Sequence, residues 1–175
     1  MELKLNNNKI KDITPLENVK FKKIEILNLS SNKISNIDSL QNIKFDNLIN
    51  LNLSYNNIDN ISSLENTEFN ILIELNLSYN KINDVSVFEK VNYQSIQTLY
   101  LSHNIIDKIN IKRKLYFPQL KSLYINDNKI KEIIIQGRIQ LDKIYNIDLS
   151  SNLLETIRIE KYQKLNNLSK LDNIF

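Results

Sequence analysis

The chain has 175 residues, with 23 basic and 20 acidic side chains and a net charge of only +3 at neutral pH. A balance this mixed disfavours nucleic acid or an anionic membrane as the partner. No apolar run approaches the roughly 18–20 residues of a membrane-spanning helix. With no cysteine and no basic start leading into an apolar signal segment, we expect a cytoplasmic protein without disulfides.

An asparagine recurs every 24 residues along the whole chain. Its seven occurrences are Asn8, Asn32, Asn56, Asn80, Asn104, Asn128 and Asn152. Self-similarity on this scale is typical of a repeat architecture. We therefore expect one domain over residues 1–175, built from seven 24-residue copies. We call these residues the ladder asparagines and number each copy so that its ladder asparagine is position nine.

Apolar residues occupy positions four and six of every copy, and position one from the second copy onwards. In the third copy they are Leu48, Leu51 and Leu53. Alternation with polar neighbours at positions four to six indicates a strand with one buried face. Positions eleven and fourteen are apolar as well, as in Ile58 and Ile61. One copy cannot bury so few apolar groups alone, so we expect stacked copies to share a continuous core.

The stretch after position fourteen changes character along the chain. In the first four copies, Thr14, Asp38, Ser62 and Ser86 are each followed three residues later by Glu or Gln. This capping-box spacing predicts short helical turns. The last three copies instead alternate Ile109/Ile111, Ile133/Ile135 and Ile157/Ile159, which predicts extended segments. The cross-section of the molecule should therefore change between residues 105 and 115.

Written out, each copy reads LxxLxLxxNxIxxI, and this pattern resembles the leucine-rich repeat family over almost the entire chain. The tail IxxLxxIxF looks most like the internalin and phosphatase-regulator subclass, with about two more residues per repeat. The resemblance implies an α/β repeat solenoid: a right-handed horseshoe with a parallel sheet on its concave side. It also implies protein recognition as the general function. Each ladder asparagine carries a donor and an acceptor that can satisfy backbone groups at the bend after the strand.

The two ends depart from the pattern. Residues 158–175 fit either a degenerate eighth copy, through Leu168 and Leu171, or an amphipathic capping helix. Met1 already lies in the first strand, with no capping structure before it. An uncapped end exposes apolar groups and a free strand edge. We therefore expect either a piece of a longer protein or a partner that replaces the missing cap.

Enzyme chemistry finds little support in these residues. His103 is the only histidine and Gly137 the only glycine, so metal-ligand sets, phosphate loops and catalytic triads are not indicated. We expect no enzyme activity, cofactor, metal ion or small-molecule substrate. The run Lys112-Arg113-Lys114 could contact phosphate or an acidic partner, but a solvated turn is the simpler interpretation.

Positions three, five, seven and eight should face the concave, solvent side, where most residues are Asn or Ser. The exceptions are Tyr55, Tyr79 and His103 at position eight and Tyr100 and Tyr124 at position five, with Asp127 and Asp148 beside them. Strands about 4.8 Å apart would gather the five rings into one patch. Aromatic patches are typical of protein-binding hot spots. The alternatives are that the tyrosines only cover the sheet, or that the chain is a scaffold or spacer segment of a larger multidomain protein.

Overall fold

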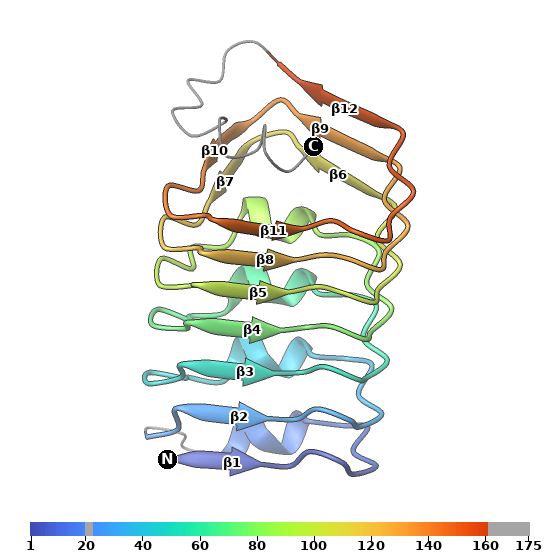
Figure 1. Ribbon diagram of the computed structural model, residues 1–175. Coiled ribbons are helices and arrows are strands. Elements are labelled where there is room, and N and C mark those ends of the chain that lie inside the picture. The colour runs from blue at the N-terminus through green and yellow to red at the C-terminus, as the bar shows by residue number, and fades with distance from the viewer. Residues whose placement is uncertain (20–22, 161–175) are drawn as a thin grey trace.

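A computed structural model describes residues 1–19 and 23–160. Its main element is a parallel sheet in which each of the seven copies contributes one strand (Figure 1). The strands, in spatial order, are β1 (Glu2–Lys4), β2 (Ile26–Asn28), β3 (Asn50–Asn52), β4 (Glu74–Asn76), β5 (Thr98–Tyr100), β8 (Ser122–Tyr124) and β11 (Asn146–Asp148). Neighbouring strands pair with a constant shift of one copy, so that Leu27 faces Leu51 and Leu51 faces Leu75. The predicted repeat solenoid is confirmed.

Helical turns line the opposite side of the first four copies, as predicted. They are the 3-10 helices η1 (Thr14–Asn18), η2 (Asp38–Asn42), η3 (Ser62–Asn66) and η4 (Ser86–Glu89). The capping-box interpretation is wrong, because no side chain caps these helices from the predicted position. Instead, the residue two places earlier accepts the backbone N–H: Asn60 Oδ1 takes that of Ser62 at 2.8 Å, and Asp84 Oδ1 takes that of Ser86 at 2.8 Å. An Asx turn of this kind satisfies the same donor without a helix cap.

Strands replace the helical turns in the last three copies. β6 (Lys108–Ile111), β9 (Glu132–Ile135) and β12 (Thr156–Ile159) form a three-stranded parallel sheet, which confirms the predicted extended segments. A two-stranded sheet that the sequence did not predict joins β7 (Lys114–Tyr116) to β10 (Arg138–Gln140). Figure 1 shows these two sheets meeting at a corner opposite the seven-stranded sheet. The cross-section thus becomes three-sided at the predicted place. Of the terminal segment 158–175, the first residues belong to β12, and 161–175 lie outside the described residues.

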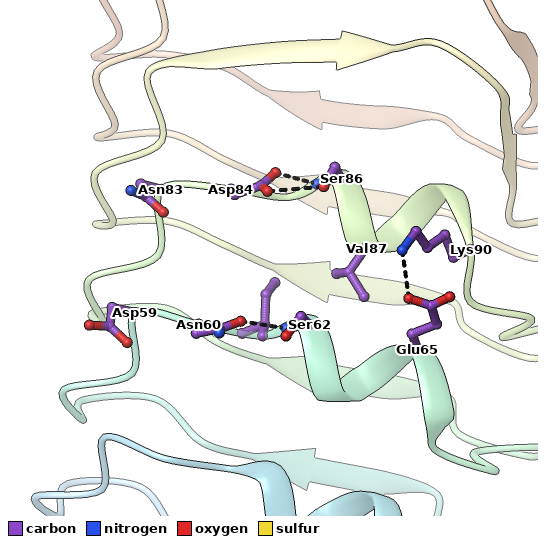
Figure 2. A pocket seen from close by; sticks show the side chains of 10 residues that line it. Asp59, Asn60, Ser62, Glu65, Asn83, Asp84, Ser86, Val87 and Lys90 are labelled. Carbon is purple, nitrogen blue, oxygen red and sulfur yellow. Dashed lines mark hydrogen bonds and ion pairs between the residues drawn. The ribbon is translucent and has the colours of Figure 1, made fainter.

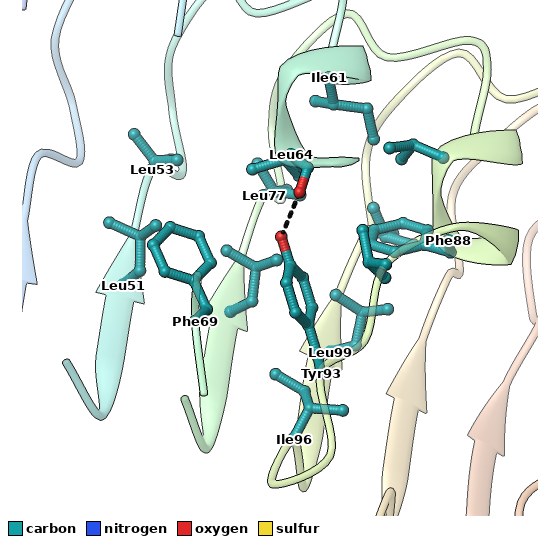
Figure 3. Packing of buried hydrophobic residues seen from close by; sticks show 14 of the residues in the cluster. Leu51, Leu53, Ile61, Leu64, Phe69, Leu77, Phe88, Tyr93, Ile96 and Leu99 are labelled. Carbon is teal, nitrogen blue, oxygen red and sulfur yellow. Dashed lines mark hydrogen bonds between the residues drawn. The ribbon is translucent and has the colours of Figure 1, made fainter. Parts of the chain in front are cut away.

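The core runs between the sheet and the opposite side. Leucines and isoleucines at positions one, four, six and eleven are fully buried in the second, third and fourth copies. An aromatic row completes the core, with Phe45 and Phe69 centroids 5.8 Å apart and Phe69 and Tyr93 centroids 5.6 Å apart (Figure 3). Burial weakens at the last copy, where Ile157 and Ile159 are each 38% exposed. The copies therefore bury their apolar groups mainly against one another, as expected for a solenoid.

The ladder asparagines connect each copy to the one before it. Asn80 Nδ2 donates to the carbonyls of Leu77 in its own copy and Leu53 in the preceding copy, at 3.1 and 3.0 Å. Its Oδ1 accepts the backbone N–H of Ile58 at 3.0 Å. The same three bonds recur at the other ladder asparagines from the second copy onwards. The ladder is buried from Asn32 to Asn128, whereas Asn8 is exposed and Asn152 is half-buried at its two ends.

Replacing a ladder asparagine should cost much more inside the stack than at its edge. Asn80→Ala leaves the Ile58 N–H and two carbonyls without this partner, and we expect a loss of about 3 kcal/mol in unfolding free energy. Asn8→Ala is the matched control, because exposed Asn8 donates only to Leu5 and Asn6 of its own copy. It should cost under about 1 kcal/mol. If urea unfolding showed the same loss of unfolding free energy for Asn80→Ala and Asn8→Ala, the ladder would not connect the copies as described.

In the aromatic row of Phe45, Phe69 and Tyr93, only Tyr93 carries a hydroxyl. This hydroxyl donates to the Leu64 carbonyl at 3.0 Å (Figure 3), and it lies 2.6 Å from Thr67 Oγ1. Burial raises the pKa of the Tyr93 hydroxyl far above its usual range, and the bond to Thr67 opposes this only in part. The folded state therefore holds this proton where the unfolded chain, with a pKa of about 10, has lost it.

The contribution of Tyr93 to stability should be complete below about pH 10 and should fall as the pH rises further. Tyr93→Phe should lose about 1 kcal/mol at pH 7.5, because a buried hydrogen bond is removed. The variant should then lose less stability than the parent protein between about pH 7.5 and pH 11. Urea unfolding followed by circular dichroism at both values measures this difference. If the parent protein and Tyr93→Phe lost the same unfolding free energy between these two pH values, the buried Tyr93 hydroxyl would not be the group responsible.

Gly137 lies where the backbones of two copies approach closely. A Cβ atom at this position would lie 1.9 Å from the carbonyl oxygen of Arg113, and its neighbours there are also backbone atoms that cannot rotate away. Gly137→Ala should therefore force β10 away from β7 and destabilise the protein by about 2–3 kcal/mol. Gln136→Ala, at the exposed neighbouring residue, is the control and should cost less than about 0.5 kcal/mol. Thermal melts of the two variants would test the difference.

Candidate binding face

Position eight has the same unusual backbone in every copy. The residues there, with φ between 53° and 58°, are Asn7, Ser31, Tyr55, Tyr79, His103, Asp127 and Ser151. Asparagine and aspartate tolerate this left-handed conformation, whereas a bulky residue in it is uncommon and costs about 1 kcal/mol or more. Three successive copies nevertheless place an aromatic ring there, so these rings are held in a strained turn.

The rings at position eight stack on one another along the sheet edge. Tyr55 and Tyr79 have centroids 4.0 Å apart and planes within 9°, and Tyr79 and His103 have centroids 4.0 Å apart and planes within 18°. His103 Nε2 lies 3.5 Å from Asp127 Oδ2 in the next copy. Tyr55 and Tyr79 are 52% and 39% exposed. We call Tyr55, Tyr79, His103 and Asp127 the turn column.

A second stack stands on the strands themselves. Tyr100 of β5 faces Tyr124 of β8, and Tyr124 faces Asp148 of β11. The two rings have centroids 4.9 Å apart and planes within 6°, and both are half-buried. We call Tyr100, Tyr124 and Asp148 the strand column. The five rings singled out from the sequence are thus arranged in two parallel columns, each followed by a carboxylate in the next copy.

The surroundings of the rings favour neutral tyrosine hydroxyls. The Tyr55 hydroxyl raises the pKa of Tyr79, with smaller contributions from burial and from the charges of Tyr55 and Asp127. Burial raises the pKa of Tyr100, and the charges of Glu74 and Tyr124 add to the effect. Glu74, at position three of β4, therefore belongs to the same electrostatic environment. The sequence prediction did not include Glu74, because its relation to Tyr100 depends on the pairing of β4 with β5.

Most side chains at position seven do not face solvent, contrary to the sequence prediction, and Ser150 in the last copy is the exposed exception. Ser54, Ser78 and Ser102 are buried at this position. The left-handed residue that follows turns the chain so that the serine folds inward, and Ser54 N and Oγ donate to Asn52 Oδ1 at 3.0 and 2.7 Å. Ser102 donates to Asn126 Oδ1 at 2.6 Å. The candidate binding face therefore comprises positions three, five and eight only.

A hollow on the opposite side of the third and fourth copies is explained by local structure (Figure 2). Two of its three carboxylates have partners: Asp84 accepts the N–H and hydroxyl of Ser86, and Glu65 pairs with Lys90 at 2.7 Å, whereas Asp59 is exposed. An equivalent hollow lies between the first and second copies. Such hollows are the spaces between successive helical turns and offer no distinctive chemistry.

Residues 1–19 and 23–160 contain neither a membrane-spanning helix nor a metal-ligand cluster. No helix in this part of the chain is long and apolar enough to cross a membrane. No group of three or more His, Asp or Glu side chains there could hold a metal ion. Ser102 and His103 diverge, since the serine is buried while the histidine lies in the turn column.

Models of the leucine-rich repeat family match the sequence in two places. A model of two leucine-rich repeats matches residues 2–42, and a single-repeat model matches residues 71–88. The chain is a leucine-rich repeat protein. Proteins of this family commonly mediate protein interactions, and their fold is generally non-enzymatic.

Solved leucine-rich repeat structures share the fold at low sequence identity. Internalin C2 from Listeria monocytogenes is 22% identical, with a TM-score of 0.55, over 90% of this chain and 70% of that protein. A leucine-rich repeat protein of Leptospira interrogans is 20% identical, with a TM-score of 0.56, over 99% of this chain and 52% of that one. The leucine-rich repeat domain of APL1B is 18% identical, with a TM-score of 0.54, over 99% of this chain and 64% of that one. A comparison with curated protein sequences finds no match.

Proposed function

We propose that this leucine-rich repeat protein binds a protein or peptide on its concave sheet, through the turn column and the strand column. The observation that supports this most strongly is the pair of exposed, stacked tyrosines, Tyr55 and Tyr79, in a left-handed turn. Strain of this kind is often retained at binding sites, where the surrounding structure holds it.

The solenoid itself has no need for rings at position eight. Asn7, Ser31 and Ser151 occupy it in the first, second and seventh copies, with the same backbone. A stacked pair of rings contributes about 0.5–1.5 kcal/mol, which is of the same size as the strain it must offset. A purely structural spacer therefore gains little from these tyrosines, and the spacer hypothesis is not favoured.

Stacking also prepares the rings for binding. Tyrosine offers a large contact area at a low cost in side-chain entropy, and each ring here is already positioned by its neighbour. The polar residues around the columns, such as Asn52 and Asn76, resemble the polar rim of a typical interface. Tyr55, Tyr79, Tyr100, His103 and Tyr124 would form the contact area, with Asp127 and Asp148 fixing its orientation.

Substitutions taken from other copies test this without disturbing the fold. Asparagine occupies position eight in the first copy and position five in the second to fourth copies, so Tyr79→Asn with Tyr100→Asn restores residues that the solenoid already uses. Twelve-residue peptides would be selected against the parent protein from a random phage library. We expect their binding to the double variant, measured by interferometry, to weaken at least about tenfold.

Tyr145→Asn provides the matched control. Tyr145 is 70% exposed and lies in neither column, so its substitution should leave peptide binding unchanged. Selected peptides that bind the double variant as tightly as the parent protein, with both proteins folded by circular dichroism, would refute the proposed function.

A further inference from the structure

The candidate binding face carries a charge opposite to that of the whole molecule. Over the third to seventh copies, positions three, five and eight include Glu74, Asp127 and Asp148 but no lysine or arginine. The chain as a whole has a net charge of +3. Lys33, Lys81 and Lys129 lie instead at position ten, which follows the buried ladder asparagine on the loop that leaves the sheet, and Lys121 at position two donates to Gln97 Oε1. Cations are thus kept off the face that carries the rings.

Each of the three carboxylates lies beside an aromatic ring. Asp127 follows His103 in the turn column, and Asp148 faces Tyr124 across β8 and β11. Glu74 of β4 faces Thr98 of β5, two residues before Tyr100, and its charge helps to raise the pKa of the Tyr100 hydroxyl. Asp148 uses Oδ1 for the N–H and hydroxyl of Ser150. In the described part of the chain, neither Glu74 nor Asp148 forms an ion pair with a lysine or arginine.

We infer that the partner is an extended peptide segment whose arginine side chains stack on these tyrosines and pair with these carboxylates. This inference rests on the proposed function above. A guanidinium group is planar, stacks on aromatic faces and donates two parallel hydrogen bonds to a carboxylate. An acidic segment would be repelled by the face. A purely apolar segment would strip water from the carboxylates without providing partners.

Strand spacing sets the separation of the two arginines. Three strand spacings separate β4, which carries Glu74, from β11, which carries Asp148, and this amounts to about 14 Å. An extended peptide covers about the same distance in four residues, and residues four apart point to the same side. A segment lying across the strands could therefore place one arginine near Glu74 and another near Asp148, with the residues between them over Tyr100 and Tyr124.

The probe is a nine-residue peptide with arginine at its third and seventh positions and glycine or serine elsewhere. Its counterpart carries citrulline, which keeps the shape and removes the charge. Nuclear magnetic resonance titration of the 15N-labelled protein would follow the amides of Tyr100 and Tyr124. We expect saturable shifts with the arginine peptide and at least about tenfold weaker binding of the citrulline peptide.

A charge-only variant tests the carboxylates. Glu74→Asn with Asp148→Asn should weaken the arginine peptide at least about tenfold. Both changes suit the fold, because asparagine occupies position three as Asn50 and Asn146. It also occupies position five as Asn28, where its Oδ1 accepts the same bonds from serine that Asp148 accepts. Asp59→Asn with Asp107→Asn, at two exposed residues outside the face, removes equal charge and should leave binding unchanged.

Equal affinities for the arginine and citrulline peptides, or equal losses in the two charge variants, would overturn the inference. The proposed function would survive that result if the phage-selected peptides still required Tyr79 and Tyr100. If the selected peptides bound the Tyr79→Asn, Tyr100→Asn variant as tightly as the parent protein, the proposed function would be refuted, and the arginine inference with it.

Discussion

The side-chain amide of the ladder asparagine is the interaction on which the rest of the structure depends. Each amide bonds to its own copy and to the preceding one, as Asn80 does through Leu77, Leu53 and Ile58. Because these groups are buried, leaving them unpaired would cost more than any single apolar contact in the copy contributes. The ladder therefore sets the rotation and spacing of neighbouring copies, and the leucines pack within that frame.

The same bend also shapes the candidate binding face. To bring the asparagine inward, the chain takes a left-handed residue at position eight, which buries the serine before it and leaves the position-eight side chain at the sheet edge. The asparagine at position nine thus stabilises the fold, while its neighbour at position eight belongs to the candidate binding face. The buried position nine does not vary between copies, whereas position eight carries Asn, Ser, Tyr, His or Asp with the same backbone. Variation at that position changes the surface and leaves the core intact.

Much of this architecture could be predicted from the sequence, because the period exposes the residues that do not vary. The ladder, the strands and the change near residue 108 all follow from positions that recur. What could not be predicted depends on contacts between copies. β7 and β10 pair because Gly137 lets two backbones approach. The helical turns begin with an Asx turn two residues before the predicted cap. The seven copies do include Asn7, Ser31, Asp127 and Ser151 at position eight, residue types that could have revealed the left-handed turn.

Because the copies keep a constant register, the side chains in the two columns are spaced at regular intervals. Leu51, Leu75 and Leu99 occupy equivalent places in successive copies. A deletion or a duplication of 24 residues therefore leaves the remaining strands in the same register. Removing residues 57–80, for example, would bring Tyr55 next to His103 in place of Tyr79. Each such event would move groups on the candidate binding face by about one strand spacing, 4.8 Å, and would keep the leucine and asparagine positions in register, while contacts on the opposite side, such as that of Tyr93 with Thr67, would change. Under the proposed function, the number of copies would therefore set the spacing of side chains that a partner must present.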